Sequence, residues 1–261
     1  MVENDGARRD PLPRVPDDWF EGFHEGLVAR FWRAAGATMA DDDDRLVRSL
    51  LDLPPGASVL DVPCGDGRLT IRLAAAGYAA TGVDIAAAEV ERAGRAAAEA
   101  GVPARFAVGD LRALPDVGPV DAVLSWGNSF GYLTPAHTAR SLAGMHAVLR
   151  PAGRLLLESH TVAESLLARG FERRAVYEFG GVRMTSEARY RPAESRLESE
   201  YTLEDADGHV QRARAAHHVH TTGEVVRLLR AAGFRDVTLL SGDGTTPYEL
   251  GSARLIVVAR A

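Results

Sequence analysis

Glycines and carboxylates are concentrated in the segment Val59–Arg68, which reads VLDVPCGDGR. Glycine at positions 65 and 67 lets the backbone turn sharply and approach a ligand closely, and a helix that begins after such a turn offers free N–H groups to that ligand. Asp84 stands 23 positions after Asp61. A carboxylate at the end of the second strand can accept hydrogen bonds from both hydroxyls of a ribose. The spacing therefore predicts a nucleotide-containing ligand.

Two cofactors use this arrangement, a nicotinamide dinucleotide and S-adenosylmethionine. The dinucleotide fingerprint has a third glycine where Thr70 stands, and an acidic turn repels its pyrophosphate. Asp61 and Asp66 flank the turn, and carboxylates suit the ammonium and sulfonium charges of S-adenosylmethionine. The electrostatics favour S-adenosylmethionine, while a nicotinamide-dependent oxidoreductase and a non-catalytic cofactor-binding protein with the same fold stay open as alternatives.

The composition excludes several other functions. The sequence has no lysine among its 30 basic residues, which excludes a Walker-type phosphate loop and Schiff-base chemistry. The net charge of −6 argues against a nucleic-acid partner. Cys64 is the single cysteine, so a reducing cytoplasm is expected. Residues 1–16 show no signal-peptide pattern, and the absence of a long apolar run argues against a membrane partner.

Short apolar segments alternate with helical ones through most of the chain. The predicted strands cover residues 58–62, 79–83, 104–108, 120–125, 154–158, 237–240 and 254–259. The predicted helices cover residues 69–76, 87–100, 138–149 and 223–232. This alternation is typical of an α/β fold, and we expect a Rossmann-like, mostly parallel sheet of seven strands with helices on both faces.

Two parts of the chain depart from this rhythm. Residues 172–220 show consecutive β segments separated by turns, which predicts an inserted antiparallel sheet. Residues 17–53 show apolar spacing of helical type, with a new helix expected to start at the solvated run Asp41–Asp44. The expected division is therefore a disordered leader at 1–16, a helical lid at 17–53, a core at 54–171 and 221–261, and the insertion at 172–220.

Six segments, in this order and spacing, resemble the class I S-adenosylmethionine-dependent methyltransferases. They begin with the glycine turn and with the segment TGVDI that contains Asp84, and they continue through FAVGDL, VDAVLSW, LRPAGRLLL and LLRAAGF. The resemblance extends from about residue 19 to residue 261. Pro63 stands where many members have glycine, which stiffens the turn.

The resemblance implies a cofactor site for S-adenosylmethionine. Its residues are Asp61, Cys64, Gly65, Asp84, Ile85, Asp110, Leu111, Ser125 and Trp126. Asp84 would hold the ribose and Asp110 the adenine amine, each followed by an apolar residue that packs against the adenine. Ser125 and Trp126 would lie near the methionine end. Cys64 is expected to act by packing rather than as a nucleophile.

The N-terminal helices and the insertion are not needed for cofactor binding, so we expect them to select the methyl acceptor. The arrangement is similar to that of small-molecule methyltransferases of the sugar, amine and natural-product groups, some of which dimerise through the insertion. A homodimer is therefore one expectation. SWGN at positions 125–128 replaces the motif of DNA and protein-amide methyltransferases, which argues against those substrates.

An oxygen acceptor needs a base, whereas an amine needs only to be neutral. The sequence leaves oxygen, nitrogen and carbon acceptors open. Histidine is suited to accept a proton near neutral pH, and His160 is the first candidate because it follows the fifth strand, at the edge where ligands of such folds bind. His24 and His218 are further candidates. The cluster of histidines at 217–220 has no evident acidic partner, so no metal site is predicted.

Overall fold

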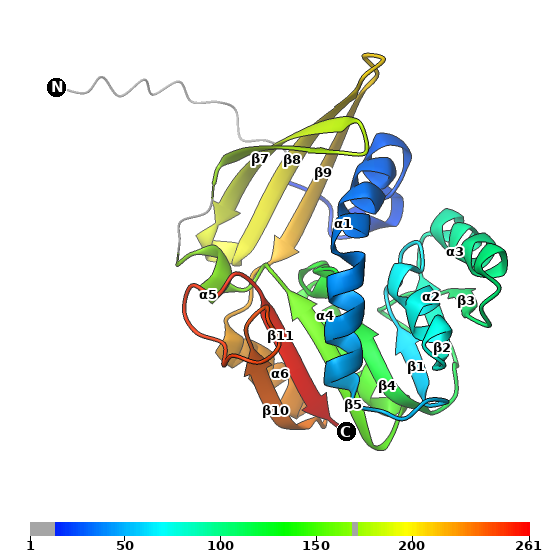
Figure 1. Ribbon diagram of the computed structural model, residues 1–261. Coiled ribbons are helices and arrows are strands. Elements are labelled where there is room, and N and C mark those ends of the chain that lie inside the picture. Colours follow the sequence, from blue (N-terminus) through cyan, green and yellow to red (C-terminus); the bar gives the residue numbers. More distant parts are fainter. Residues whose placement is uncertain (1–13, 169–171) are drawn as a thin grey trace.

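The computed structural model describes residues 14–168 and 172–261. Seven strands form one sheet in the order β10-β11-β5-β4-β1-β2-β3, in which only β11 is antiparallel to its neighbours. Figure 1 shows this sheet in the lower part of the molecule. The strands are β1 (Ser58–Asp61), β2 (Ala79–Asp84), β3 (Arg105–Val108), β4 (Val120–Ser125), β5 (Leu149–Ser159), β10 (Arg235–Leu240) and β11 (Leu255–Arg260). The predicted Rossmann-like architecture is confirmed.

Helices cover both faces of this sheet, which explains the unbroken apolar run at the end of β5. Leu155 and Leu157 face the layer of α4 and α6, whereas Leu156 faces α1 and α2. Neighbouring side chains of a strand point to opposite faces, so a central strand with two covered faces is apolar at every position. The helices are α1 (Gly26–Leu51), α2 (Arg68–Ala75), α3 (Ala87–Ala100), α4 (Pro135–Ala147) and α6 (Thr222–Ala231).

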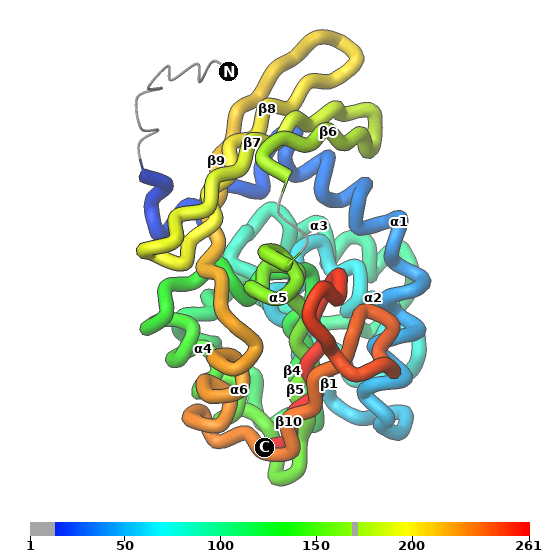
Figure 2. Tube along the Cα trace, turned by 90° about the vertical axis from the view of Figure 1, so that its left-hand side faces the viewer, coloured from blue at the N-terminus to red at the C-terminus, as the bar shows by residue number. Residues whose placement is uncertain are grey.

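The predicted insertion folds as a second, antiparallel sheet in the order β6-β7-β8-β9. Its strands are β6 (Arg174–Phe179), β7 (Val182–Arg191), β8 (Arg196–Asp205) and β9 (Val210–His218). One face of this sheet packs on the first turns of α1 through a separate apolar cluster that includes Phe31, Met184 and Tyr201. Figures 1 and 2 show the insertion above the core, with α1 running from beneath it down along the core.

The expectation that a helix starts at Asp41–Asp44 is wrong, because these residues lie inside the single helix α1. Val28, Val47 and Leu51 are buried along this helix, so one amphipathic stripe continues through the acidic run. Asp41, Asp42 and the half-buried Asp44 pair with arginines one turn away or on α2, which stabilises the helix interior. Asp43, in contrast, points inward and is buried.

The predicted leader is only partly within the described residues, since residues 1–13 lie outside them. Residues 14–16 differ from the predicted disordered leader, because they pack on the insertion. Val15 is buried, and its carbonyl accepts a hydrogen bond of 2.6 Å from the buried guanidinium of Arg196 on β8. The segment therefore crosses the insertion before the short helix η1 (Trp19–Gly22). None of the described helices is long and apolar enough to cross a membrane.

Candidate functional site

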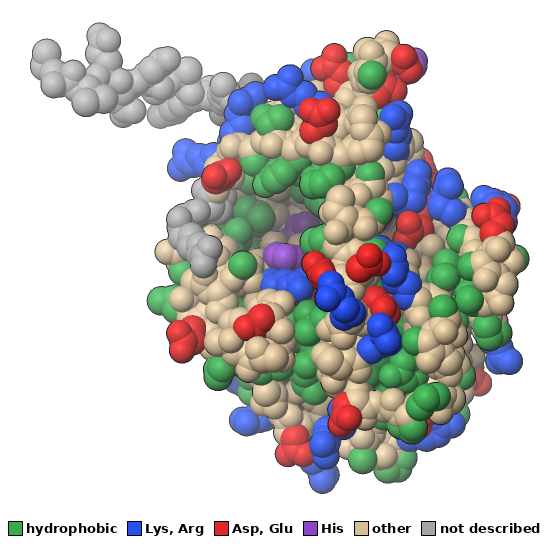
Figure 3. All heavy atoms as spheres, viewed as in Figure 1, with side chains coloured by type: hydrophobic (Ala, Val, Ile, Leu, Met, Phe, Trp, Pro, Cys, Tyr) green, Lys and Arg blue, Asp and Glu red, His purple; other side chains and the backbone are tan. Residues whose placement is uncertain are grey.

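A cavity of about 710 Å³ lies between the carboxyl ends of the parallel strands and the layer formed by η1, α1 and the insertion. In Figure 3 the surface is hollowed between the upper and lower parts of the molecule, and histidine side chains are visible in the hollow. The strand order reverses between β4 and β1, and the crevice outside such a reversal is the usual ligand site of open α/β sheets. The topology therefore accounts for the position of the cavity.

The turn after β1 forms one wall of this cavity. Gly65 has a positive φ of 54°, and a side chain at this position would point into open space. Its N–H donates to Oδ2 of Asp84 at 2.8 Å, while Oδ1 of Asp84 accepts from the N–H of Ala86 at 2.9 Å. Asp84 is thus held by two backbone donors and still lines the cavity. Each carboxylate oxygen keeps a second lone pair for a ligand.

Asp61 lies behind the turn rather than on the cavity wall. Its buried carboxylate accepts a hydrogen bond of 2.6 Å from Oγ1 of Thr70. Burial raises the pKa of Asp61 to about 7, against the lowering effects of the Thr70 hydrogen bond and of Arg68. Thr70, which stands where the dinucleotide fingerprint has its third glycine, therefore stabilises the turn through Asp61. Asp61 is not among the residues that line the cavity, so its contact with a cofactor stays a prediction.

The other predicted cofactor residues divide between the wall and the interior. Cys64, Ile85, Leu111 and Trp126 line the cavity, whereas Ser125 borders a separate small void instead. Burial raises the pKa of the Cys64 thiol, which makes it a poor nucleophile. The indole Nε1 of Trp126 is buried without a hydrogen-bond partner among the described residues.

Asp110 lies on the wall beyond β3 and is tied to the N-terminal helix. Its carboxylate accepts hydrogen bonds from the backbone N–H and from Nε of Arg112, both at 2.7 Å. Burial raises the pKa of Asp110, but the Arg112 hydrogen bonds outweigh that effect and lower it. The same guanidinium also donates to Glu21 of η1 at 2.5 Å. Arg112 therefore connects η1 to the predicted adenine end of the cavity.

His160 lines the cavity and forms an acid–base pair with Glu158 at the end of β5. Its Nε2 lies 2.7 Å from Oε1 of Glu158, whose other oxygen accepts the backbone N–H groups of Gly127 and Asn128. Burial lowers the pKa of His160, but the Glu158 carboxylate outweighs this and raises it. The side chain of Glu158 is 1% exposed, whereas that of His160 is 47% exposed. The buried Glu158 carboxylate therefore influences a ligand in the cavity mainly through its contact with the more exposed His160 imidazole.

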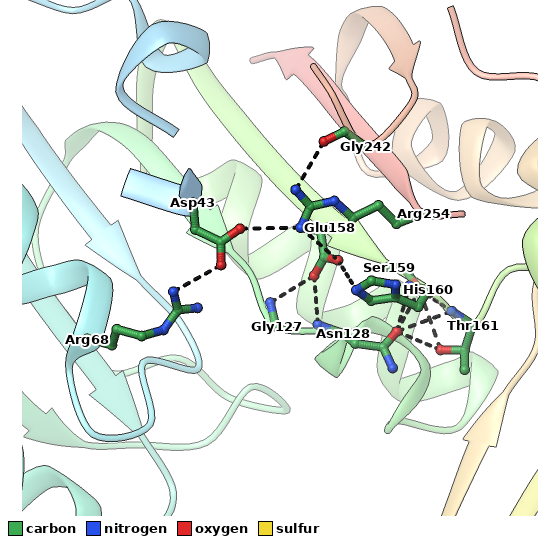
Figure 4. Close-up of polar contacts among 10 residues, drawn as sticks. All are labelled: Asp43, Arg68, Gly127, Asn128, Glu158, Ser159, His160, Thr161, Gly242 and Arg254. Atoms are coloured by element: carbon green, nitrogen blue, oxygen red, sulfur yellow. Dashed lines mark hydrogen bonds and ion pairs between the residues drawn. The ribbon is translucent and has the colours of Figure 1, made fainter. Parts of the chain in front are cut away.

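Asn128 fixes the backbone on the other side of this pair. Its Oδ1 accepts from the backbone N–H groups of His160 at 2.8 Å and Thr161 at 3.2 Å, and from the Thr161 hydroxyl at 2.8 Å (Figure 4). Because an N–H can only donate, the oxygen of the amide must face this loop, and the amide nitrogen faces away. The loop that carries His160 is thus anchored at three points.

A chain of charges connects this pair to the lid helix α1 (Figure 4). Asp43 of α1 accepts from Arg68 at 2.9 Å and from Arg254 at 3.3 Å. Arg254 lies 3.9 Å from Glu158 and 5.8 Å above the ring centre of Trp126. Asp43 of α1 therefore meets Arg68 at the start of α2 and Arg254 just before β11. Arg254 extends the contacts to Glu158 near the end of β5, along one side of the cavity.

Of the two further candidate histidines, His24 lies on the cavity wall as predicted, whereas His218 does not. His24 lines the cavity near Asp84, and burial lowers its pKa. His218 does not reach the cavity wall, whereas its neighbour His217 does. Neighbouring residues of a strand face opposite sides, so the sequence predicts that His217 and His218 point in opposite directions. It does not predict which face of β9 meets the cavity.

The sequence did not predict several residues of the wall, namely Asn128, Tyr132, Glu158, Tyr201, His217 and Arg254. Most of them belong to loops or to the insertion. Glu158 had one signal, because it is a lone carboxylate in the apolar run that precedes His160. The others depend on packing between distant segments.

Comparison with known proteins gives one family match, to a methyltransferase domain over residues 59–153. The chain is 34% identical over 146 residues to 27-O-demethylrifamycin SV methyltransferase from Amycolatopsis mediterranei, which covers 53% of this chain and 51% of that protein. The chain spans about half or less of the length of the curated relatives it matches.

Solved structures extend the likeness to most of the chain. An S-adenosylmethionine-dependent methyltransferase from Clostridium acetobutylicum superposes with a TM-score of 0.72 at 14% identity, covering 83% of this chain and 89% of that one. An amino pentose methyltransferase from Micromonospora echinaspora, determined with bound S-adenosylmethionine, gives a TM-score of 0.64 at 24% identity, covering 88% and 94%. At these identities the likeness establishes the fold.

Proposed function

We propose that the chain is a class I S-adenosylmethionine-dependent methyltransferase and that it transfers a methyl group to a small-molecule acceptor, because its methyltransferase-domain match, its curated relatives and its fold agree. The observation that carries this proposal is the cradle formed by the turn after β1 and by Asp84 on the wall of one large cavity. The acceptor belongs to the metabolite or natural-product class, as in the rifamycin and amino pentose methyltransferases named above.

The residues present fit S-adenosylmethionine. The open space in front of Gly65 accepts a ligand backbone, and Asp84 offers lone pairs for ribose hydroxyls. Asp110 and Leu111 would hold the adenine, while Trp126 would lie near the methionine end. When bound, the cofactor supplies an electrophilic methyl group on a sulfonium. The cavity volume of about 710 Å³ is within the range of ligand sites, with room for an acceptor next to the cofactor.

We assign His160 as the general base and Glu158 as the residue that positions it. The imidazole stands at the strand edge on the cavity wall, and the ion-pair contact of its Nε2 with Glu158 orients the ring. It can take the proton that an acceptor hydroxyl releases, and the neighbouring carboxylate stabilises the resulting imidazolium. This arrangement favours an oxygen acceptor, since a neutral amine needs no base before it attacks.

The remaining parts of the proposal concern the surroundings of the site. The lid formed by residues 17–53 and the insertion enclose the acceptor. Edge strand β6 exposes Val176 and Tyr177, so we propose that two copies pair along it, because an uncovered edge strand favours pairing. A cytoplasmic location fits the single cysteine, and the net charge of −6 fits a protein without a nucleic-acid partner.

The direct experiment offers the protein S-adenosylmethionine with a deuterated methyl group and a panel of phenols, alcohols and amines. Mass spectrometry then detects the labelled methyl group on a product. We expect transfer to a hydroxyl compound, lost in the absence of the protein. If S-adenosylhomocysteine binds but no panel member, nor any compound of a metabolite extract, accepts the label, the non-catalytic alternative is favoured. Tight binding of NAD in its place would favour the oxidoreductase.

A further inference from the structure

Three neutral rings meet where η1, the loop after η2 (Ser129–Gly131) and the insertion line the cavity. Two of their polar atoms, Nε1 of Trp19 and Nδ1 of His217, have no hydrogen-bond partner among the described residues. The rings are those of Trp19 of η1, Tyr132 after η2, and His217 of β9. The ring centres of Trp19 and Tyr132 are 4.7 Å apart, and those of Tyr132 and His217 are 5.1 Å apart. We name this group the ring cluster.

The packing around the ring cluster is tight at the backbone. A side chain on Gly131 would meet the carbonyl oxygen of His218 at 2.8 Å and Cβ of His217 at 3.3 Å. Only a glycine therefore allows η2 to press against β9, which keeps Tyr132 and His217 in contact. Three elements that are distant in the sequence are fixed together here, so the ring cluster is a built feature and not a loose surface group.

Two polar atoms of the ring cluster are buried at a cost in free energy that no contact among residues 14–168 and 172–261 offsets. His217 is 8% exposed, and both Nδ1 of His217 and Nε1 of Trp19 are buried without partners among the described residues. A buried polar group that lacks a partner destabilises the fold. A ligand that brings a matching group into the cavity removes this cost, and an indole N–H needs an acceptor, which an oxygen atom supplies.

Charge separates this side of the cavity from the cofactor side. The carboxylates on the wall belong to α1 and the core, for example Asp84, Glu89 and Glu158, whereas the described residues that η1 and the insertion contribute to the wall are all uncharged. Burial lowers the pKa of His217 to about 4, so its imidazole is neutral at physiological pH. An ammonium group there would lose its hydration and gain no carboxylate.

We propose that the ring cluster is the specificity subsite of the acceptor, and that it selects an uncharged ring compound with a hydroxyl or carbonyl oxygen for His217 and Tyr132 to bind. This inference rests on the proposed function and narrows its substrate class. His217 is then a recognition residue, while His160, which lines the same cavity, moves the proton. The pKa of His160 is raised and that of His217 is lowered, and such a difference separates the roles of two titratable groups.

Three probes of similar size test the inference by binding alone, in protein saturated with S-adenosylhomocysteine. They are 2-naphthol, 2-methylnaphthalene and the cation 2-naphthylmethylammonium. We expect 2-naphthol to bind about tenfold more tightly than 2-methylnaphthalene, and the cation to bind most weakly. In His217→Phe the tenfold preference falls to about twofold, whereas His218→Phe, the matched control off the wall, keeps it. Tyr132→Phe lowers the preference as well and serves as the second variant if His217→Phe does not fold.

The inference is overturned if 2-naphthol does not bind at millimolar concentration, if the preference survives in His217→Phe, or if the cation binds most tightly. The last result would instead assign the rings to cation–π recognition. The affinity for S-adenosylhomocysteine is measured first and separately. If that cofactor product does not bind, the proposed function fails, while the same three probes still test the subsite in the free protein.

Discussion

At the scale of single residues, the pair of His160 and Glu158 makes a pH-dependent reaction the expected behaviour. The pKa of His160 is raised, with the carboxylate of Glu158 outweighing burial, and the base acts in its neutral form. We therefore expect kcat/KM to rise with pH through an apparent pKa above 6.5. In Glu158→Gln the charge that raises the pKa is lost, so the rise moves to lower pH. An unchanged pH profile in Glu158→Gln would remove the pair from the reaction.

Removing the base gives a second prediction. His160→Ala should lower kcat on the order of a hundredfold for a hydroxyl acceptor, with the affinity for S-adenosylhomocysteine unchanged, as measured by steady-state kinetics and calorimetry. His146→Ala is a suitable control, because His146 lies on α4 against Phe234 and away from the cavity. Full turnover of His160→Ala between pH 6 and pH 9 would contradict the assignment.

His217 predicts how stability changes with acid. Its pKa in the folded protein is about 4, below the usual 6.5 of the unfolded chain. Stability from the neutral imidazole is thus fully present above pH 6.5 and is lost as the pH falls toward 4. Relative to His217→Phe, the wild type should lose about 3 kcal/mol of unfolding free energy over this interval, measured by urea titration at each pH. Parallel curves for the two proteins would show that His217 is not buried.

The position of a site residue was predictable from the sequence where it depends only on the residue's own strand or turn. Asp84 is the last residue of β2 and His160 directly follows β5, so their position at the edge of the sheet was predictable. Asp61 also ends a strand, but Thr70 holds its side chain behind the turn, and the sequence did not reveal this contact. His217 and Tyr132 meet only because η2 and β9 press together.

At the scale of elements, α1 is the lid helix, and Asp43 holds it against the core. Its carboxylate, 2% exposed, binds Arg68 and Arg254. Removing one member of a buried ion pair leaves charge without a partner. We expect Asp43→Ala to lower the unfolding free energy by about 3 kcal/mol and to weaken S-adenosylhomocysteine binding.

The control for this prediction lies one residue away. Asp42 is exposed and pairs only with the exposed Arg45 among the described residues, and such surface pairs contribute little. Asp42→Ala should therefore melt within a degree or two of the wild type. Equal effects of the two replacements in thermal unfolding and in calorimetry would show that α1 is not held through Asp43.

Most elements of the core were predicted with small errors in their limits. The strand Val120–Ser125 and the helix Ala87–Ala100 have the predicted limits, because apolar periodicity and a following glycine define them. Helix α4 begins earlier than predicted, at Pro135, where Thr134 supplies the cap. The acidic run in α1 was misinterpreted because carboxylates mark helix starts in isolation, whereas here arginines from other elements pair with them.

At the scale of the whole molecule, the cavity depends on two parts that join only through tertiary contacts. The core supplies the turn, Asp84 and His160, while η1, α1 and the insertion supply the opposite wall. The fold class was predictable because six motifs occur in order. The pairing of the insertion with α1 through Phe31 and Met184 was not, since apolar periodicity shows that a face is buried but not which face covers it.

The proposed homodimer is a prediction at the same scale. If two copies pair along β6, sedimentation at micromolar concentration should give a dimer, and Val176→Lys should give a monomer, because a charged edge strand resists pairing. Val210 is exposed on β9, the opposite edge strand of the same sheet, so Val210→Lys is a control that leaves the dimer intact. A wild-type protein that sediments as a monomer would contradict this part of the account.

Calorimetric titration of S-adenosylhomocysteine and NAD into the wild type and Asp84→Ala distinguishes a methyltransferase cofactor site from a dinucleotide site. Circular dichroism first establishes that the variant folds, because Asp84 also accepts the N–H groups of Gly65 and Ala86. The account predicts that S-adenosylhomocysteine binds the wild type, that NAD does not, and that Asp84→Ala loses about 2–3 kcal/mol of binding free energy. Tight binding of NAD, or native affinity for S-adenosylhomocysteine in Asp84→Ala, would contradict the account.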